Sequence, residues 1–264
     1  IFLTGKAGTG KTTFLRTLKE RSNKRNIIVA PTGVAAINAG GMTIHSFFQL
    51  PLSPFVPNTN IKNRFDYSKE KRKIMRTLDL LIIDEISMVR ADVLDAIDSV
   101  LRRFREPDKP FGGVQLLMIG DLQQLTPVVT PEEEELLRQY YDTPYFFGSK
   151  ALRSISYVTI ELTHVYRQQD ATFITLLNNI REGKVSADDL QRLNERYDPT
   201  FQPKEGSDYI RLTTHNRMAE SYNEDQLRKL PAKAYTFSAE TDGNFPEYNY
   251  PTDFNLTLKT GAQV

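Results

Sequence analysis

The fold of this chain is predicted by the stretch Ile1-Phe2-Leu3-Thr4-Gly5-Lys6-Ala7-Gly8-Thr9-Gly10-Lys11-Thr12. Residues 5–12 match G-x-x-x-x-G-K-[ST], the pattern of a phosphate-binding loop. The apolar run before the loop indicates a strand, and residues 13–18 continue with the apolar spacing of a helix. Because this pattern requires a strand before it and a helix after it, the sequence predicts a site for a nucleoside triphosphate.

The residue types of this loop suit a polyphosphate. Its glycines let backbone N–H groups turn toward phosphate, and the start of the following helix adds the positive end of its dipole. Lys11 can reach the outer phosphates, and the Thr12 hydroxyl can ligate Mg²⁺. The candidate nucleotide-binding residues are Gly5, Ala7, Gly8, Thr9, Gly10, Lys11, Thr12 and Thr13.

A second motif supplies two carboxylates. The apolar run 80–83 ends in Asp84 and Glu85, as expected for a buried parallel strand that delivers acids to the carboxyl edge of a sheet. Asp84 is placed to hold Mg²⁺ together with Thr12, and Glu85 is the candidate to position the attacking water. The alternative is that both are surface acids that cap a helix beginning at residue 86.

A third motif begins with another buried-strand pattern, residues 114–121, and continues into a loop that contains Gln123 and Gln124. In such a sheet, the strand beside the Asp-Glu strand can place a polar group against the γ-phosphate. An amide suits this position because it can donate to phosphate or orient water without titrating. On chemistry alone, either glutamine could do so.

The order of these motifs resembles that of superfamily-one helicases, most closely the petite-integration-frequency (Pif-type) DNA helicases of the 5′-to-3′ branch, with RecD-like relatives. The resemblance covers residues 1 to about 170 densely, and its segments are 5–13, 30–36, 43–48, 83–89, 120–128 and 162–168. Thr126 departs from the pattern, since the family often has proline there. We expect this change to alter the stiffness of the loop slightly and the chemistry not at all.

The resemblance implies roles that the residues alone leave open. It favours Gln124 over Gln123 as the γ-phosphate sensor and assigns Arg167 a γ-phosphate contact from the start of a second motor domain. With Lys11 and Glu85, these are the candidate catalytic residues. The implied activity is that of a monomeric DNA helicase that uses ATP and Mg²⁺ and translocates 5′ to 3′. Its implied partners are single-stranded DNA and forked or structured duplex DNA, in repair, recombination or telomere maintenance.

Two loops that follow early strands are expected at the same sheet edge as the phosphate loop. Hydroxyls and N–H groups at helix starts suit phosphate contacts, and an exposed aromatic ring suits base stacking, worth roughly 1–3 kcal/mol per base. The alternatives are a core position for Phe47 or Phe48, which we expect for at least one ring, and a helix cap for His45 or for residues 214–216. The candidate nucleic-acid residues are Pro31, Thr32, Gly33, His45, Ser46, Phe47, Thr214, His215 and Asn216.

The alternation of strand and helix patterns predicts an α/β fold, a RecA-like parallel sheet with helices on both faces. Strands are expected near 1–4, 26–30, 79–84, 115–120 and 157–162, and helices near 11–22, 33–40, 68–78, 91–104 and 132–140. The first domain is predicted to be 1–165, with 49–67 an inserted loop or small subdomain. Residues 166–264 are predicted to begin a second RecA-like domain, with helices at 171–181, 187–196 and 217–230, a strand at 209–213 and a β-rich segment from about 234.

Composition fits this interpretation. The chain has 264 residues, 39% of them hydrophobic and 25% charged, and no cysteine, so disulfides and cysteine-ligated metals are excluded. No run of 18 apolar residues indicates a membrane span. The net charge of +1 argues against a uniformly basic nucleic-acid binder, although residues 60–76 are locally basic, as a solvated helix face also would be. From the implied activity we expect an intracellular protein, in the cytoplasm (nucleoid) if bacterial and in the nucleus or a mitochondrion if eukaryotic.

Parts of the family pattern are expected outside this sequence. An adenine-recognition element would lie before residue 1, and later DNA-contacting and γ-phosphate arginine motifs have no match here. Since a missing arginine finger costs roughly 10³–10⁵ in rate, we expect the 264-residue chain to bind nucleotide but turn over poorly. Two other classes stay open, a nucleotide-gated nucleic-acid binder without unwinding and an AAA+-type remodelling ATPase, and activity on forked DNA separates all three.

Overall fold

The computed structural model describes the whole chain except residues 57–66, 205–206, 208, 242–251 and 264. The chain forms two compact units, Ile1–Glu195 and Arg196–Val264. This division falls later than the domain boundary predicted after residue 165, which stays a prediction. Of the predicted insertion at 49–67, residues 49–56 contain no helix or strand, and 57–66 lie outside the described residues.

The first unit is built on a six-stranded sheet with the order β3-β2-β4-β5-β1-β6, in which every pairing is parallel. Five of its strands were predicted from the sequence, and β3 is short enough to have escaped the pattern. The strands are β1 (Phe2–Gly5), β2 (Asn26–Ala30), β3 (Met42–Thr43), β4 (Leu80–Ile83), β5 (Gln115–Ile119) and β6 (Thr159–Leu162).

The register aligns the strand ends that carry the motifs. Met118 of β5 pairs with Phe2 of β1 on one side and with Ile83 of β4 on the other. Because all three strands run in the same direction, the loops that follow them leave from one edge of the sheet. The phosphate loop, the Asp-Glu pair and the glutamine loop are therefore neighbours, as the sequence predicted.

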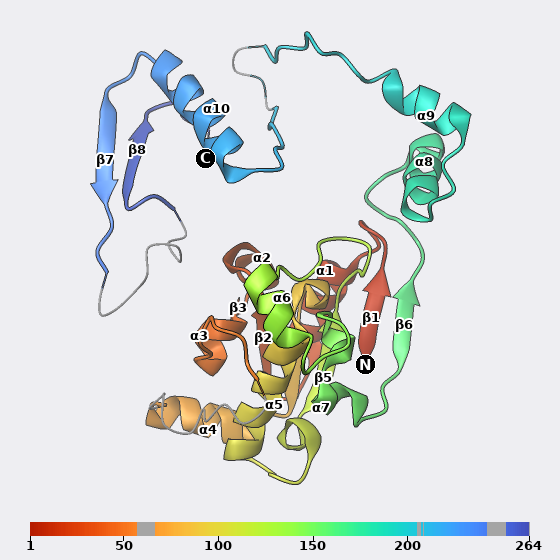
Figure 1. Cartoon of the computed structure of the whole chain (residues 1–264), viewed down its shortest axis with the longest axis vertical. Helices are drawn as coiled ribbons and strands as arrows, with labels where there is room; N and C mark the ends of the chain where they lie inside the picture. Colours follow the sequence, from red (N-terminus) through yellow and green to blue (C-terminus); the bar gives the residue numbers. More distant parts are fainter. Residues whose placement is uncertain (57–66, 205–206, 208, 242–251, 264) are drawn as a thin grey trace. The chain divides into compact units, whose positions relative to one another are not determined.

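Helices cover both faces of this sheet, which confirms the predicted layering (Figure 1). Alternate strand residues divide between two cores: Ile82 packs in a core with Leu15 of α1, and Ile83 packs in a larger core with Ile97 of α5. The helices of this unit are α1 (Lys11–Arg21), α2 (Gly33–Ala39), α3 (Ile44–Phe48), α4 (Lys69–Thr77), α5 (Ala91–Phe104), α6 (Pro131–Leu137), α7 (Lys150–Arg153), α8 (Ala171–Arg181) and α9 (Ala187–Asn194), with short 3₁₀ turns η2 (Ile86–Met88), η3 (Pro110–Gly113) and η4 (Phe146–Gly148).

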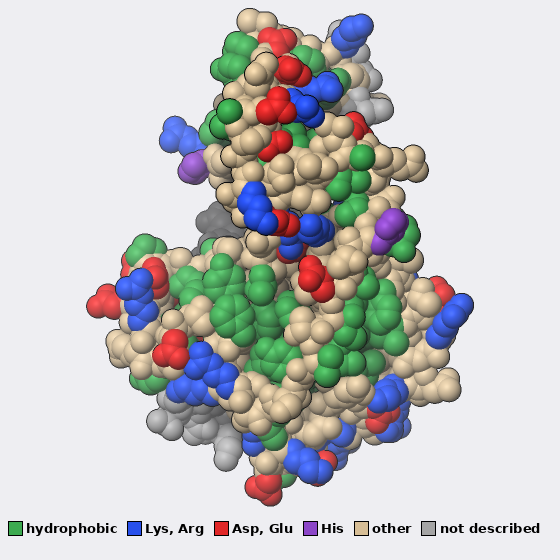
Figure 2. Space-filling view, turned by 90° about the vertical axis from the view of Figure 1, so that its right-hand side faces the viewer, with side chains coloured by type: hydrophobic (Ala, Val, Ile, Leu, Met, Phe, Trp, Pro, Cys, Tyr) green, Lys and Arg blue, Asp and Glu red, His purple; other side chains and the backbone are tan. Residues whose placement is uncertain are grey.

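β6 forms an edge of the sheet, since it pairs with β1 alone. Its side chains are partly exposed, with Val158 just before it 65% exposed and Ile160 within it 45% exposed. Figure 2 looks onto the side of the first unit that carries β1 and β6 and shows hydrophobic side chains gathered there. The loop after β6 leads to Arg167 and then to α8.

The second unit contains α10 (Asn216–Lys229) and an antiparallel pair, β7 (Ala234–Ser238) and β8 (Asn255–Lys259). The predicted helix and β-rich segment are thus present. The strand predicted at 209–213 is wrong: these residues have no regular secondary structure, and no strand in the described part of this unit pairs with them. Ile210 is 74% exposed and Leu212 91% exposed, so the apolar pattern there covers no core of this unit.

Candidate nucleotide site and nucleic-acid surface

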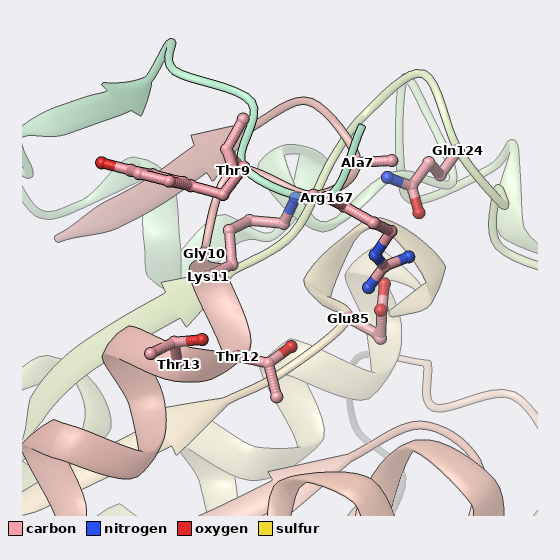
Figure 3. A pocket seen from close by; sticks show the side chains of 11 residues that line it. Ala7, Thr9, Gly10, Lys11, Thr12, Thr13, Glu85, Gln124 and Arg167 are labelled. Atoms are coloured by element: carbon pink, nitrogen blue, oxygen red, sulfur yellow. The ribbon is translucent and has the colours of Figure 1, made fainter. Parts of the chain in front are cut away.

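A cavity of about 360 Å³ lies at the carboxyl edge of the sheet and gathers most of the predicted nucleotide-site residues (Figure 3). Of the predicted set, Gly5 and Asp84 do not line it. Tyr166 lines it without having been predicted. The lining residues are Ala7, Gly8, Thr9, Gly10, Lys11, Thr12, Thr13, Glu85, Gln124, Tyr166 and Arg167.

The conformation of the phosphate loop depends on its glycines. Gly8 and Gly10 have φ of 76° and 90°, in the left-handed region that favours glycine. A Cβ on Gly8 would lie 2.6 Å from Cβ of Arg167, so only glycine lets the two segments approach. The backbone N–H of Tyr166 also donates to the Gly8 carbonyl at 2.8 Å. The segment after β6 is therefore joined directly to the phosphate loop.

Lys11 begins α1 and folds back over the loop. Its Nζ donates to the carbonyl oxygens of Gly5 at 2.6 Å and Lys6 at 3.0 Å. Burial lowers the pKa of the Lys11 ammonium, while the carboxylates of Asp121 and Glu85 act to raise that pKa. The ammonium thus lies inside the loop and among carboxylates, where a phosphate group would meet a positive charge.

Asp84 and Glu85 follow β4 directly. Glu85 has φ 50° and ψ 44°, a left-handed conformation that is uncommon for a residue with a side chain. Its N–H donates to the Asp84 carboxylate at 3.0 Å, and burial raises the pKa of both carboxyl groups. Glu85 precedes η2, but its side chain makes no capping bond there. The alternative interpretation of these acids as helix caps therefore finds no support.

The residues proposed for Mg²⁺ fit a cation that phosphate helps to hold. Thr12 and Asp84 offer a hydroxyl and a carboxylate, the oxygen ligands that Mg²⁺ prefers. Within the described parts of the chain, no group of three or more His, Cys, Asp or Glu could hold a metal by itself. Mg²⁺ commonly binds through one or two carboxylates plus substrate phosphates, which matches this donor set.

The glutamine loop after β5 distinguishes its two amides. Gln124 lines the cavity and Gln123 does not. The Gln124 Nε2 donates to Asp121 Oδ2 at 2.8 Å, whereas Gln123 contributes only its backbone N–H to Oδ1 of Asp121 at 3.1 Å. The placement supports Gln124 as the residue that faces a nucleotide, and its role as a sensor stays a prediction.

Tyr166 and Arg167 come from the loop after β6, within the first unit. Figure 3 shows the Arg167 guanidinium extending toward Glu85. The Tyr166 side chain is 71% exposed, and its ring meets the His164 ring edge-on with centroids 4.3 Å apart. An exposed ring beside the phosphate loop offers a flat surface to a nucleotide base. Its position beside Arg167 in the Tyr-Arg-Gln segment was the signal that could have identified it.

The predicted nucleic-acid loops of the first unit lie at the expected edge, after β2 and β3. Gly33 and Ser46 are exposed, whereas the Thr32 hydroxyl caps α2 by accepting from the Ala35 N–H at 3.2 Å. Pro31 and His45 are partly buried. The pKa of the His45 imidazole is lowered, mainly by burial and to a smaller extent by the positive charge of the nearby Arg90. His45 lies inside α3; the cap of α3 is the Thr43 hydroxyl.

Phe47 requires a correction. It is 2% exposed and its neighbour Phe48 is 0% exposed, and their rings meet edge-to-face with centroids 4.8 Å apart inside the larger core. The expectation that at least one of them is a core residue holds for both. The exposed stacking ring predicted at Phe47 is wrong, because a ring packed in the core presents no face to a base.

The candidates in the second unit, Thr214, His215 and Asn216, lie at the start of α10. The Thr214 hydroxyl and Nδ1 of His215 are 2.9 Å apart, which engages both side chains with each other. His215 occupies the capping position, but its side chain makes no capping bond, and Asn216 is the first helical residue. The described residues directly before them, 209–213, form no strand, so the predicted strand-end geometry is absent here.

These features define a P-loop domain of the RecA-like class: a phosphate loop after β1, an Asp-Glu pair after β4, and a polar loop after the strand between them. A family model described as PIF1-like helicase matches residues 1–191. The chain belongs to this family. Among the described residues, no helix combines the length and apolar character needed to cross a membrane.

Individual relatives agree over the whole chain. The ATP-dependent DNA helicase PIF1 of Homo sapiens is 38% identical over 280 residues, covering 100% of this chain and 40% of the relative. A solved structure described as two coordinating Pif1 helicases at forked double-stranded DNA matches with 44% identity and a TM-score of 0.86, covering 98% of this chain and 60% of that one. A Pif1 helicase from Bacteroides in complex with ADP-AlF3 and single-stranded DNA matches with 43% identity and a TM-score of 0.85, over 98% and 59%. The chain thus spans about 40% of the human relative and about 60% of the solved chains.

Proposed function

We propose that this chain is the ATPase-bearing part of an ATP-dependent DNA helicase that moves 5′ to 3′ on single-stranded DNA and opens forked or structured duplexes. The observation that carries the proposal is the shared cavity, in which the phosphate loop, Glu85, Gln124 and Arg167 face one volume. The Bacteroides relative that was solved with ADP-AlF3 and single-stranded DNA supports ATP as the nucleotide and DNA as the partner. The polarity rests on family resemblance.

Each residue has a defined task in ATP hydrolysis. The backbone N–H groups of residues 8–12 cradle the phosphates, and the Lys11 ammonium exchanges its bonds to the Gly5 and Lys6 carbonyls for phosphate oxygens. Glu85 orients the attacking water and accepts its proton, a task to which a carboxyl group with a raised pKa is suited.

Arg167 and Gln124 line the same cavity, from which they would contact the γ-phosphate. The arginine stabilises the charge that develops on the transferred group, and the amide contributes hydrogen bonds without titrating. Thr12 and Asp84 would hold Mg²⁺, which when bound neutralises charge on the β- and γ-phosphates.

The DNA contacts proposed for the first unit are sequence-independent. The loops after β2 and β3 present Gly33, Ser46 and the start of α2, which suit contacts to phosphate oxygens. Since Phe47 is buried, stacking on bases must come from a different side chain. Contacts to the DNA backbone do not depend on the base sequence, which suits a protein that moves along a strand.

The experiment measures single-turnover ATP hydrolysis with and without a short oligothymidine, beside unwinding of a forked duplex. Wild type should hydrolyse ATP faster with DNA present, and Glu85→Gln should bind ATP but lose hydrolysis by roughly 10²–10⁴-fold. DNA-dependent hydrolysis without unwinding would favour a nucleotide-gated DNA binder. Hydrolysis that DNA leaves unchanged would favour a remodelling ATPase that acts on protein partners.

A further inference from the structure

The last turn of α8 contacts both loops that flank the cavity. The Arg181 guanidinium donates to Asp121 through two bonds, from Nη1 to Oδ2 and from Nη2 to Oδ1, each 2.6 Å long. The next residue, Glu182, has its carboxylate 3.6 Å from the Lys6 ammonium in the phosphate loop. The first contact is a bidentate pair to a buried carboxylate, and the second is exposed and weak.

Asp121 distributes its two oxygens between α8 and the glutamine loop. Its side chain is 1% exposed. Oδ2 accepts from Nε2 of Gln124 at 2.8 Å and from Arg181, and Oδ1 accepts from the Gln123 N–H at 3.1 Å and from Arg181. The Arg181 pair and the hydrogen bond to Gln124 both act to lower the pKa of Asp121, against the effect of burial, and the net pKa is lowered. Asp121 is therefore an anion that accepts from both partners.

We propose that Arg181, acting through Asp121, is a positioning residue that orients the Gln124 amide for ATP hydrolysis. This inference rests on the proposed function and deepens it. With one Nε2 hydrogen directed at Asp121, Gln124 keeps its second Nε2 hydrogen for a phosphate oxygen and its Oε1 as an acceptor for a water at the cavity. Because Arg181 pins both carboxylate oxygens, Asp121 cannot rotate, and the amide holds one orientation.

The Arg181 contact does more than join α8 to the sheet. A bond that served only to dock α8 could end on any acceptor, whereas this one ends on the carboxylate that also holds Gln124. Without Arg181, Asp121 would turn to other donors, and the Gln124 amide would lose its fixed partner. A well-oriented catalytic group that becomes mobile loses rate while ground-state binding is kept.

The test is a double-mutant cycle on Arg181 and Gln124, read by single-turnover hydrolysis and by binding of a fluorescent ATP analogue. Gln124→Ala should lose roughly 10²-fold in hydrolysis, and Arg181→Gln roughly tenfold, with ATP affinity held within about twofold. The double variant should be no slower than Gln124→Ala alone within about twofold, since Arg181 acts through Gln124. Arg181→Lys keeps the charge but loses the fork, so its rate should fall between wild type and Arg181→Gln.

Arg192→Gln on α9 is the matched control, because Arg192 forms an exposed pair with Asp188 at 3.0 Å outside the cavity lining. Its hydrolysis should equal that of wild type. The inference would be overturned if the double variant lost hydrolysis by the product of the two single-variant losses, or if Arg181→Gln hydrolysed ATP at the wild-type rate. Either result would leave the proposed function standing. A wild-type chain that binds no ATP would overturn both. If Arg181→Gln fails to fold, the double-mutant cycle of Arg181→Lys with Gln124→Ala tests the inference in its place.

Discussion

The backbone of Glu85 is held in a left-handed conformation, and this leads to a prediction that separates stability from catalysis. The turn after β4 is tight because Ile86 and Ser87 lie against Gly120, the residue that follows β5: a Cβ on Gly120 would lie 2.9 Å from Cγ2 of Ile86 and 3.1 Å from the Ser87 nitrogen. Glu85, with φ 50° and ψ 44°, absorbs the change of direction. A glycine at this position would adopt the same conformation without strain.

The expected gain follows from two opposing effects. The left-handed conformation costs a residue with a Cβ roughly 1–2 kcal/mol, and glycine avoids that cost. Glycine also makes the unfolded chain more flexible, which costs about 0.4–1 kcal/mol. Glu85→Gly should therefore be more stable than Glu85→Ala by about 0.5–1 kcal/mol. For a domain of this size that corresponds to a Tm difference of about 1–4 °C.

The assay is thermal unfolding of Glu85→Gly, Glu85→Ala and Glu85→Gln under identical conditions. All three lack the carboxylate, so the comparison of Gly with Ala isolates the backbone, and Gln tests whether a longer side chain changes the result. Each variant should also lose ATP hydrolysis by about 10²–10⁴-fold and keep ATP binding. A Tm of Glu85→Gly equal to or below that of Glu85→Ala would refute the strain argument, whatever the activity.

Three further predictions address binding, packing and pH. Lys11→Ala should weaken ATP binding roughly 10–100-fold in a fluorescence titration, because it removes charge-assisted bonds to phosphate; unchanged affinity would contradict that role. Asp95→Ala should destabilise the protein by at least about 3 kcal/mol in urea unfolding, because it leaves the Tyr141 hydroxyl and the other buried donors to this carboxylate without an acceptor. A destabilisation below about 1 kcal/mol would contradict this role of Asp95. Arg25 lowers the pKa of Asp79 from 3.8 to about 2, so Asp79 adds stability above pH 3.8 that is lost as pH falls to about 2. Asp79→Asn should therefore have the lower Tm at neutral pH, with the two curves converging near pH 2; a constant difference would contradict this origin.

The cavity could be predicted from the sequence because its chemistry is local in the chain. Each motif is a few consecutive residues at the end of a strand, and parallel strands bring such ends to one edge. To predict that residues 8–12 and Glu85 line one cavity, it was enough to know which strands lie close together in the sheet. Gln124 could be separated from Gln123 only by resemblance, until the structure showed that Asp121 holds the side chain of one and the backbone of the other.

What the sequence could not show depends on partners far along the chain. Arg181 lies 60 residues from Asp121, and no local pattern joins them. Phe47 belongs to a five-residue helix, too short for its apolar spacing to say which ring faces the core. The apolar pattern at 209–213 can form a strand only if a neighbouring strand pairs with it through backbone hydrogen bonds. The sequence of one segment does not show whether such a neighbour exists.

The structure attaches Arg167 closely to the phosphate loop. The resemblance implied that this arginine acts from the start of a second motor domain. In the structure it belongs to the first unit, joined to the phosphate loop by the bond from Tyr166 to Gly8 and by a contact at Gly8 that only glycine allows. The hydrogen bond and the close approach at Gly8 therefore hold the backbone of Arg167 against the phosphate loop.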